Sequence, residues 1–331
     1  GQTSNRGIEL QLNAWLVETK DFSLNATFNI GHNKNKIDKL ASGEKEWILT
    51  SAWRNDVVNS DDYRAYVGGT SGLIYGYVND GFYTVADFEP FDSKSRSWKL
   101  KEGVVDSSPL SDTPRPGNAK FKKLTPVDPN STNPYQLTEA DRTVIGNTTP
   151  KFSGGFGLNA TYKGFDMSMF FNFMYDFDVL NANKIMLTTW ADNKENNFLM
   201  NIASDKRWRN FDDMGNEIRY SPEVLAEFNK NATMWNPTSI GRPICMSYAV
   251  EDGSFLRLNS ATLGYTLPSV WTKKVGLSKV RFYVSGNNLF TLTGYSGYDP
   301  EVNIATGLTP NIDYNRYPRS RTYTFGAQLT F

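Results

Sequence analysis

The chain has 331 residues, no net charge at pH 7 and 14% aromatic residues. A mean hydropathy of −0.49 and the lack of any run of about twenty apolar residues exclude a helical membrane protein. Balanced charge argues against nucleic-acid binding, and one cysteine (Cys245) and one histidine (His32) can form neither a disulfide framework nor a zinc site. We expect Cys245 to be an unreactive, packed thiol.

Two alternating segments lie near the start of the chain. Residues 8–16 place apolar side chains at every second position, and residues 22–30 repeat the pattern after a polar turn at 18–21. Such alternation puts apolar side chains on one face of a strand and polar ones on the other, as a strand between lipid and a polar lumen requires. The segments therefore predict an antiparallel hairpin that crosses a membrane.

A second hairpin is predicted in the next stretch of the chain. Residues 73–78 and 82–86 are rich in aromatic and β-branched residues, and they flank the turn sequence Asn79-Asp80-Gly81. This turn type commonly joins antiparallel strands. We interpret the pair as two further crossings of the membrane.

A third hairpin covers residues 152–162 and 165–177. In its second strand, seven large apolar residues alternate with polar residues that include Asp166, Asp176 and Asp178. So wide an apolar face is hard to keep soluble, and the charged groups opposite need water. The segment favours a strand between lipid and a polar lumen.

Three more strands are predicted at the C-terminal end, over residues 254–267, 280–285 and 321–331. In the first, Arg257 falls on the same face as Leu263, which indicates that the upper part of this strand leaves the lipid. In the last, apolar residues alternate almost without interruption up to the final Phe331.

The connections are unequal in length. Short links alternate with long ones, and outer-membrane barrels place short turns in the periplasm and long loops outside. If Phe331 is periplasmic, an even number of crossings must separate residue 30 from residue 152, which the predicted hairpin at 73–86 supplies. This arrangement amounts to about nine crossings, with Gly1 outside the cell. The chain shows no signal peptide, so we expect a mature, processed or partial chain.

The long loop after residue 179 has features of its own. Residues 181–191 have helical composition, and Ser221 is a candidate N-cap with Pro222 at the first helical position. Trp190, Trp208 and Trp235 lie in this loop. They are candidates for stacking on a sugar, a peptide or a lid, but packing within the loop is the favoured interpretation.

Several motifs, taken in order, resemble those of SusC/RagA-type TonB-dependent outer-membrane transporters. The C-terminal ones are Glu251-Asp-Gly-Ser-Phe-Leu-Arg-Leu258, Leu263-Gly-Tyr-Thr-Leu-Pro268, Val284-Ser-Gly-Asn-Asn-Leu-Phe290, Gly297-Tyr-Asp-Pro-Glu301, Tyr317-Pro318 and Thr324-Phe-Gly326 to Phe331. The upstream ones are Asn5-Arg-Gly-Ile-Glu9, Tyr75-Gly-Tyr77 with Asp80-Gly81, Ile145-Gly-Asn-Thr-Thr-Pro-Lys-Phe152 and Tyr162-Lys-Gly-Phe-Asp166. No single motif is strong, but their order and spacing cover essentially the whole chain.

The resemblance implies an all-β fold, namely the C-terminal portion of an antiparallel transmembrane barrel of about 22 strands. Long extracellular loops would contain short helices, and residues 1–331 would form one segment of a single barrel domain. The plug, the TonB box and the early strands would lie outside this chain. The family often carries an acidic segment before the Gly-Asn-x-x-Pro motif; residues 124–141 lack that spacing, so no cation site is carried over.

The resemblance also implies a function and partners. Members import oligosaccharides or peptides through the outer membrane of Gram-negative bacteria, with a SusD-like lipoprotein as extracellular lid and the TonB complex supplying force. The rest of the barrel, the bilayer and a dimer of transporter–lipoprotein pairs are further expected partners. An alternative is a SusC-like structural or assembly subunit without active import, and a third option, a small self-contained porin, fits the odd strand count poorly.

Nothing in the sequence indicates an enzyme or a cofactor. No nucleophile–base pair or phosphate-binding glycine loop is found, and the pairs Asp141-Arg142 and Asp212-Asp213 are expected to be ordinary loop charges. Candidate lumen-facing residues are Asp166, Asp176, Asp178, Arg281 and Gln328, for which plug contact or solvation is the simpler explanation. The terminal strand, as in outer-membrane barrels generally, is expected to act as the barrel-assembly signal through Tyr323, Phe325, Leu329 and Phe331.

Overall fold

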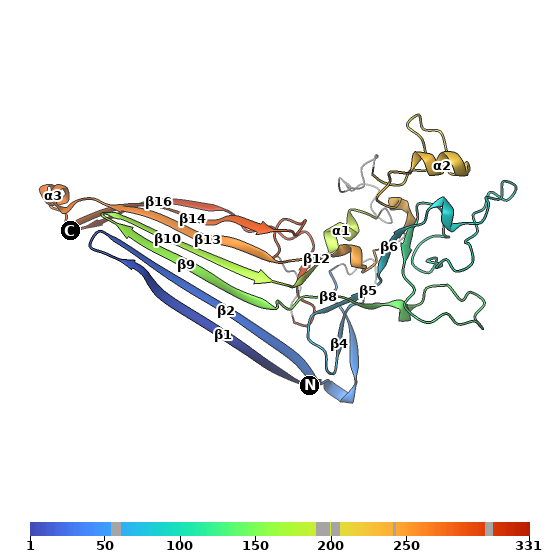
Figure 1. The fold of residues 1–331 in the computed structure, drawn as a ribbon, viewed down its shortest axis with the longest axis horizontal. Coiled ribbons are helices and arrows are strands. Elements are labelled where there is room, and N and C mark those ends of the chain that lie inside the picture. The colour runs from blue at the N-terminus through green and yellow to red at the C-terminus, as the bar shows by residue number, and fades with distance from the viewer. Residues whose placement is uncertain (54–60, 190–198, 200–205, 241–242, 302–306) are drawn as a thin grey trace.

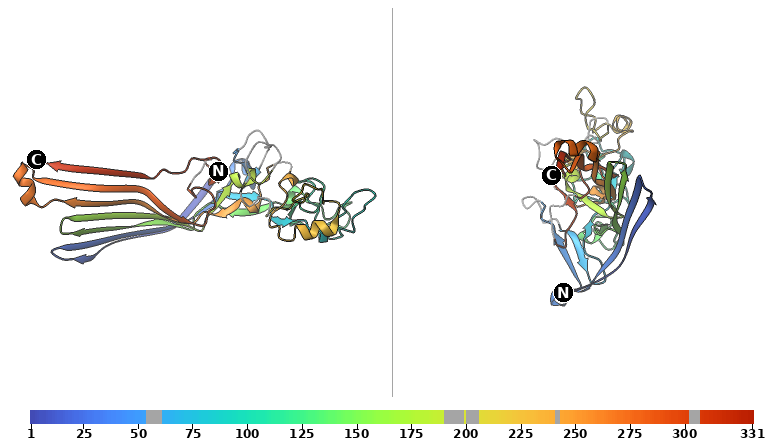
Figure 2. Two further views of the ribbon diagram at one scale, coloured as in Figure 1. Left: turned by 90° about the horizontal axis from the view of Figure 1, so that it is seen from above. Right: turned by 90° about the vertical axis from the view of Figure 1, so that its left-hand side faces the viewer.

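The computed structural model describes residues 1–53, 61–189, 199, 206–240, 243–301 and 307–331. Its largest element is a seven-stranded antiparallel sheet, an elongated wall with the rest of the chain gathered at one end (Figures 1 and 2). In spatial order the strands are β1 (Gln2–Glu18), β2 (Phe22–Lys39), β9 (Phe152–Tyr162), β10 (Phe165–Tyr175), β13 (Phe255–Thr266), β14 (Lys279–Thr293) and β16 (Thr322–Thr330). The all-β antiparallel fold expected from the sequence is confirmed.

Short and long connections lie at opposite ends of this wall. The turns after β1, β9 and β13 lie at one end together with the C-terminus, whereas the N-terminus lies at the other end, beside the long loops (Figure 1). The turn after β13 contains a short helix, α3 (Ser269–Thr272), followed by η7 (Lys273–Val275). In the described part of the chain, no helix is both long and apolar enough to span a membrane.

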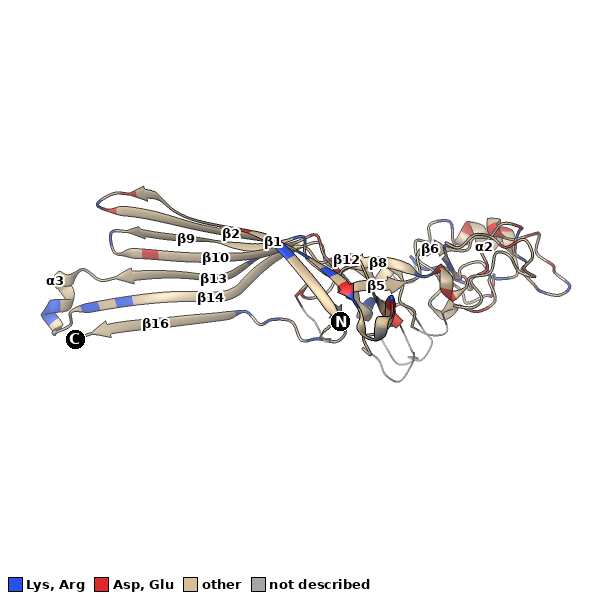
Figure 3. Ribbon diagram, turned by 90° about the horizontal axis from the view of Figure 1, so that it is seen from below, with Lys and Arg blue, Asp and Glu red and all other residues tan. Residues whose placement is uncertain are grey.

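The wall has one apolar and one polar face, as the alternation predicts. Apolar side chains such as Ile8, Phe282 and Phe325 are 78%, 51% and 80% exposed, which is unusual for large apolar groups arranged along one face. Charged residues are sparse along the seven strands (Figure 3). Among the described strands, the terminal strand β16 pairs only with β14, and Phe331 follows its end with 90% of its surface exposed.

The predicted membrane-crossing hairpin at residues 73–86 is wrong. Strand β2 pairs directly with β9, so the described residues between them add no strand to the wall. The first half of the predicted hairpin forms β5 (Leu73–Gly76), which is only four residues long and buried on both faces. The turn residues belong to β6 (Asn79–Phe82), which pairs with β7 (Ala119–Phe121). The wall therefore has seven strands in the described chain. The number of membrane crossings between residues 30 and 152, which was expected to be even, is zero among the described residues.

The prediction that Arg257 shares a face with Leu263 is wrong, because a β-bulge lies between them. Asn259 is an extra residue in the pairing of β13 with β10, and β14 compensates with an extra residue beside Asn288, whose φ is +53°. Because side chains alternate along a strand, one extra residue moves Arg257 to the face opposite that of Leu263. Arg257 thus lies on the polar face of the wall, opposite Asn172 of β10.

Strand β10 also ends earlier than the alternation predicts. It stops at Tyr175, and Asp176 adopts a positive φ of +59°, which breaks the extended backbone. Asp178 then begins β11 (Asp178–Asn181), which belongs to a separate small sheet with β12 (Val250–Asp252) and β15 (Ile312–Asp313). Asp176 and Asp178 are therefore not part of the strand face that carries Asp166.

The remaining described residues form what we call the loop region, at the end of the wall away from the C-terminus. A four-stranded sheet consists of β3 (Glu46–Thr50), β4 (Asp61–Tyr66), β5 and β8 (Thr143–Asn147). The short helices are α1 (Ala182–Met186), α2 (Pro222–Phe228), η1 (Ala41–Gly43), η2 (Val85–Asp87), η3 (Glu139–Asp141), η5 (Pro237–Ser239) and η6 (Ser247–Ala249). Of the helix expected at residues 181–191, only Ala182–Met186 is helical, and residues 190 and 191 lie outside the described part of the chain. The helix expected after Ser221 is present as α2, with Ser221 as its N-cap residue and Pro222 in the first turn.

Candidate functional site: the polar face of the wall and the loop region

An ion pair crosses the polar face of the wall near its turn end. Arg281 of β14 donates from Nε to Asp166 Oδ1 of β10 at 2.9 Å, and its Nη2 contacts the second carboxylate oxygen. The two strands are separated by β13, so the guanidinium passes over Gly264, where a Cβ atom would lie 2.4 Å from Nη2. A glycine on the middle strand is therefore what permits this two-pronged pair.

Other glycines on the polar face leave room for aromatic rings. A Cβ atom at Gly326 would lie 2.4 Å from the ring of Tyr283, and one at Gly155 would lie 2.8 Å from the ring of Phe170. The Arg281 guanidinium lies 5.1 Å from the centre of the Tyr283 ring. Phe170 and Tyr283 were not among the lumen-facing residues predicted from the sequence. The signal that could have found them is the glycine on the neighbouring strand.

The predicted lumen-facing residues fall into two groups. Arg281 stands opposite Gln328 in the pairing of β14 with β16, so Asp166, Arg281 and Gln328 share the polar face. Asp176 and Asp178 instead line a cavity of about 630 Å³ where the wall meets the loop region. There Asp176 lies 3.5 Å from Lys151 Nζ, and Asp178 accepts a hydrogen bond from the Asn147 backbone at 2.7 Å. Burial raises the pKa of Asp178.

A buried charge cluster ties the last long loop to the polar face of the wall. Arg257 Nη2 lies 2.5 Å from Asp299 and 3.2 Å from Glu301, and Glu301 also pairs with Arg319 at 3.3 Å. Arg257 is only 1% exposed. Two motifs that the sequence analysis noted separately, at residues 251–258 and 297–301, therefore meet in one ion-paired cluster.

A second contact fixes the same loop. Glu251 accepts hydrogen bonds from the backbone and hydroxyl of Ser296 at 2.9 and 2.8 Å, and Lys184 lies 3.3 Å away. Burial alone would raise the pKa of Glu251, but these hydrogen bonds and the lysine hold it below its usual value. Tyr295 donates to Asp313 at 2.8 Å in the small sheet. The loop is thus held by Glu251 of the small sheet as well as by Arg257 of the wall.

Hydrogen bonds to Asp141 hold together the two ends of the segment at residues 124–141. Asp141 accepts backbone hydrogen bonds from Leu124, Thr125 and Thr138 at 2.7–2.9 Å, and Lys123 lies 3.4 Å away. Burial would raise the pKa of Asp141, but these donors outweigh it and hold the pKa below its usual range. Among the described residues, no group of three or more histidine, cysteine or acidic side chains is arranged to hold a metal ion.

Two of the three candidate tryptophans are buried in the loop region. Trp208 is 3% exposed and lies over Gly117, where a Cβ atom would be 2.1 Å from the indole ring. Trp235 is 2% exposed and meets Tyr248 edge-on, with ring centres 4.7 Å apart. Trp190 lies outside the described residues. Both described indoles lie in packed clusters of apolar side chains.

Cys245 is confirmed as a buried free cysteine, and burial raises the pKa of its thiol well above the usual value. The single histidine of the sequence, His32, contacts the backbone oxygen of Lys151 through Nδ1 at 2.6 Å. In the same part of the loop region, Asp62 is buried and accepts hydrogen bonds from the Ser51 backbone and hydroxyl. Burial raises the pKa of Asp62 to about 6.

A sheet of long antiparallel strands with an exposed apolar face and a polar face defines part of a membrane β-barrel. Comparison with known proteins agrees. TonB-dependent receptor P3 of Formosa agariphila is 32% identical over 337 residues, which cover all of this chain and 29% of that protein. TonB-dependent receptor SusC of Bacteroides thetaiotaomicron is 26% identical, covering all of this chain and 27% of that protein. No family model matches.

Solved structures support the same fold. The structure described as the RagAB peptide transporter superposes with a TM-score of 0.64 at 22% identity, over 99% of this chain and 29% of that chain. A related structure, the RagAB peptide importer in the "open-open" state, has a TM-score of 0.63. The chain belongs to the SusC/RagA-type TonB-dependent outer-membrane transporters. It spans 27–30% of the length of the curated relatives it matches, at their C-terminal part.

Proposed function

We propose that residues 1–331 form the C-terminal segment of one barrel domain in a TonB-dependent importer of oligosaccharides or peptides. The observation that carries this proposal is the two-faced wall, since only a strand between lipid and water needs one exposed apolar face and one polar face. Similarity to TonB-dependent receptors over the whole chain supports it. In this role the protein is a transporter and not an enzyme.

The polar face is proposed to line the lumen. Asp166, Arg281 and Gln328 would then meet the plug, water or passing substrate. The ion pair is proposed to hold its charges close together, which keeps the local field small for a neutral substrate. Asp176 and Asp178 would act at the rim, where they border the cavity beside Lys151.

The loop region is proposed to be extracellular and the C-terminus periplasmic. Support comes from the short turns and the C-terminus lying together at one end of the wall (Figure 1). An epitope inserted at Gly215, an exposed turn with φ of +84°, should be stained on intact cells, whereas one inserted at Gly276 should be stained only after permeabilisation. The reverse pattern would contradict this orientation.

The partners are proposed to be a SusD-like surface lipoprotein, which closes over the loop region, and the TonB complex, which acts through other parts of the transporter. Pairs of transporter and lipoprotein are proposed to form dimers. The exposed apolar side chains of Phe211, Met214 and Val224, on and before α2, offer contact area for such a lid. Affinity purification of the tagged transporter from its native membrane, followed by mass spectrometry, should recover one surface lipoprotein.

The deciding experiment is uptake in a strain that lacks the chromosomal gene. Complementation with the wild-type transporter should restore growth on its substrate, and a variant without a TonB-interacting segment should insert normally but fail to restore growth. Growth that does not depend on that segment would instead favour a structural or assembly subunit. Mass spectrometry of ligand bound to the purified complex would distinguish a glycan from a peptide.

A further inference from the structure

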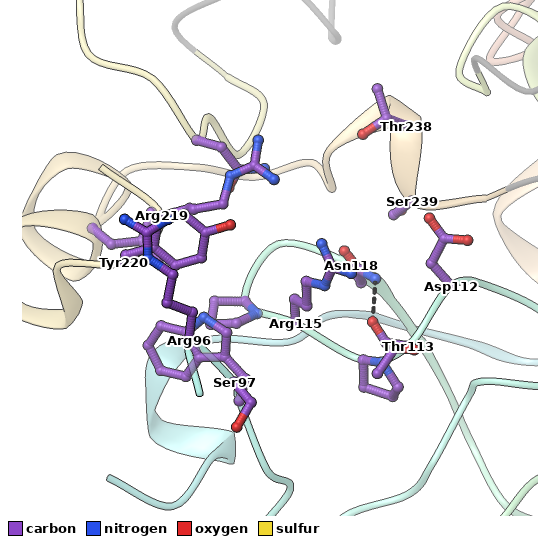
Figure 4. Close-up of a pocket in the computed structure, with 15 residues that line it drawn as sticks. Arg96, Ser97, Asp112, Thr113, Arg115, Asn118, Arg219, Tyr220, Thr238 and Ser239 are labelled. Carbon is purple, nitrogen blue, oxygen red and sulfur yellow. Dashed lines mark hydrogen bonds between the residues drawn. The ribbon is translucent and has the colours of Figure 1, made fainter. Parts of the chain in front are cut away.

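A cavity of about 270 Å³ lies in the loop region (Figure 4). Four separate stretches of chain form it, namely residues 96–98, 112–118, 210–225 and 238–239. Leu225 is the only non-proline aliphatic side chain in its lining; most of the others are charged, polar or aromatic. An uncharged apolar ligand would gain little from such a site.

Three guanidinium groups line this cavity: Arg96, Arg115 and Arg219. Arg96 lies 4.9 Å from the centre of the Tyr220 ring, and Arg219 lies 5.8 Å from the same ring. Of the three, Arg219 is paired with Glu217 at 2.6 Å, whereas Arg96 and Arg115 form no ion pair within the described chain. Against the three cations stand two carboxylates, Glu217 and Asp112, so one positive charge is left in excess, which favours an oxyanion.

The opposite side of the cavity has a different character. In the view of Figure 4, Arg96 and Arg219 lie on one side of the cavity, and Asp112, Thr238 and Ser239 lie on the other. Arg115 lies between these two groups. Within the described residues, the Asp112 carboxylate has no cationic partner. A carboxylate of this kind accepts hydrogen bonds from hydroxyl groups but repels a second anion.

We propose that this cavity binds an acidic sugar unit of an oligosaccharide, with its carboxylate or sulfate group held by the three arginines and its hydroxyl groups facing Asp112. An acidic peptide fits less well, because its closely spaced carboxylates would approach Asp112. The inference rests on the proposed uptake function only in assuming that the ligand is a molecule to be imported. Binding itself is measured without transport.

The test uses the full-length transporter in detergent, without its lipoprotein, and isothermal titration calorimetry. The probes are tetragalacturonate, a sulfated galactan tetrasaccharide, neutral maltotetraose and tetraglutamate. At least one acidic saccharide should bind at low salt and weaken as ionic strength rises. The double variant Arg96→Gln/Arg115→Gln should bind it at least roughly tenfold more weakly, since hydrogen bonds to charged groups are lost. Both side chains are exposed, so the fold should not be affected.

The matched control is Arg316→Gln, an exposed arginine outside the cavity, which should bind as the wild type does. Preference for the carboxylated or the sulfated saccharide would identify which oxyanion the site takes. The proposal would be overturned by equal binding of maltotetraose, by binding of tetraglutamate alone, by no binding, or by an equal loss in the control. A transporter that binds the acidic saccharide but fails in uptake would refute the proposed function and leave this inference standing.

Discussion

The wall and the loop region of this protein are stabilised in opposite ways. In the wall, regular strands leave large apolar side chains such as Ile8 and Phe325 exposed, and few charges are present. In the loop region, short elements surround buried tryptophans and buried charges such as Asp62 and Asp141. The difference teaches that the surroundings, lipid for one and water for the other, decide where apolar surface and charge can be placed.

The largest effect should come from the end of the wall. Phe331→Asp, or deletion of residues 329–331, should abolish membrane insertion, because the terminal aromatic strand is expected to be the signal for barrel assembly. Tyr323, Phe325 and Leu329 on the same face are expected to contribute. Membrane insertion would be measured by the heat-modifiable electrophoretic mobility of the protein and by surface labelling of whole cells.

A suitable control for this variant is Tyr298→Asp, since Tyr298 is an equally exposed aromatic residue in a loop, at 89% against 90% for Phe331. It should reach the surface at the wild-type level. Normal surface levels of Phe331→Asp would remove the proposed signal from this strand.

The next effect concerns the joint between the two regions. Arg257→Met leaves Asp299 buried without its cation and Glu301 with only the exposed Arg319, which should cost about 3–5 kcal/mol locally. The loop from residue 294 to 321 should then detach from the wall, which hydrogen exchange or limited proteolysis of that loop would detect. Lys184→Met, at the more exposed end of the second contact, should have a smaller effect. Unchanged protection in Arg257→Met would mean that the ion cluster does not hold the loop.

A smaller effect is expected within the loop region, and it should depend on pH. The folded pKa of Asp62, about 6, lies above the ordinary value of 3.8, so the folded state binds more protons between these values. Stability should therefore fall as pH rises through this window. Asp62→Asn removes the buried charge and should stabilise the β3–β4–β5–β8 sheet by roughly 1–3 kcal/mol above pH 6, and hardly at all below about pH 4.

Hydrogen exchange of residues 61–76, corrected for the intrinsic dependence of exchange on pH, would measure this difference. Asp61→Asn is the control, because the neighbouring Asp61 is partly exposed. Parallel pH profiles for the wild type and Asp62→Asn would show that the buried carboxyl does not titrate in this window.

The smallest effect is expected on the polar face of the wall. Gly264→Ala places a methyl group against the Arg281 guanidinium, which is the flexible end of a side chain and can move aside. We expect a cost of about 1 kcal/mol, chiefly from the loss of the pair with Asp166. Gly294→Ala, where no atom lies within 4 Å of the added Cβ, should be neutral. Equal thermal stability of both variants would show that the ion pair contributes nothing.

Much of the wall could be predicted because its information is local. Alternation identified all seven strands, and the turn at Lys163-Gly164 is the one observed between β9 and β10. Local patterns failed where a backbone irregularity intervened. The bulge at Asn259 put Arg257 and Leu263 on opposite faces, and the positive φ of Asp176 ended the strand before Asp178; neither is visible from hydrophobicity alone.

The loop region was predicted less well for a related reason. The segment at residues 73–78 has the composition of a strand, and it does form one, but a strand buried on both faces in a small sheet looks similar to a short membrane strand. The arginine-lined cavity was not predicted, since its four stretches span more than 140 residues of sequence.

The sequence by itself determined the fold class, the two faces of the wall and the family, because strand alternation and ordered motifs are properties of neighbouring residues. Only the tertiary structure decided how many strands the wall contains, which face Arg257 occupies, and which distant residues meet. Those outcomes depend on strand register and on contacts between segments far apart in the chain. Arg281 reaches Asp166 across a third strand, and Arg257 reaches Asp299 across a loop, for reasons that no local pattern contains.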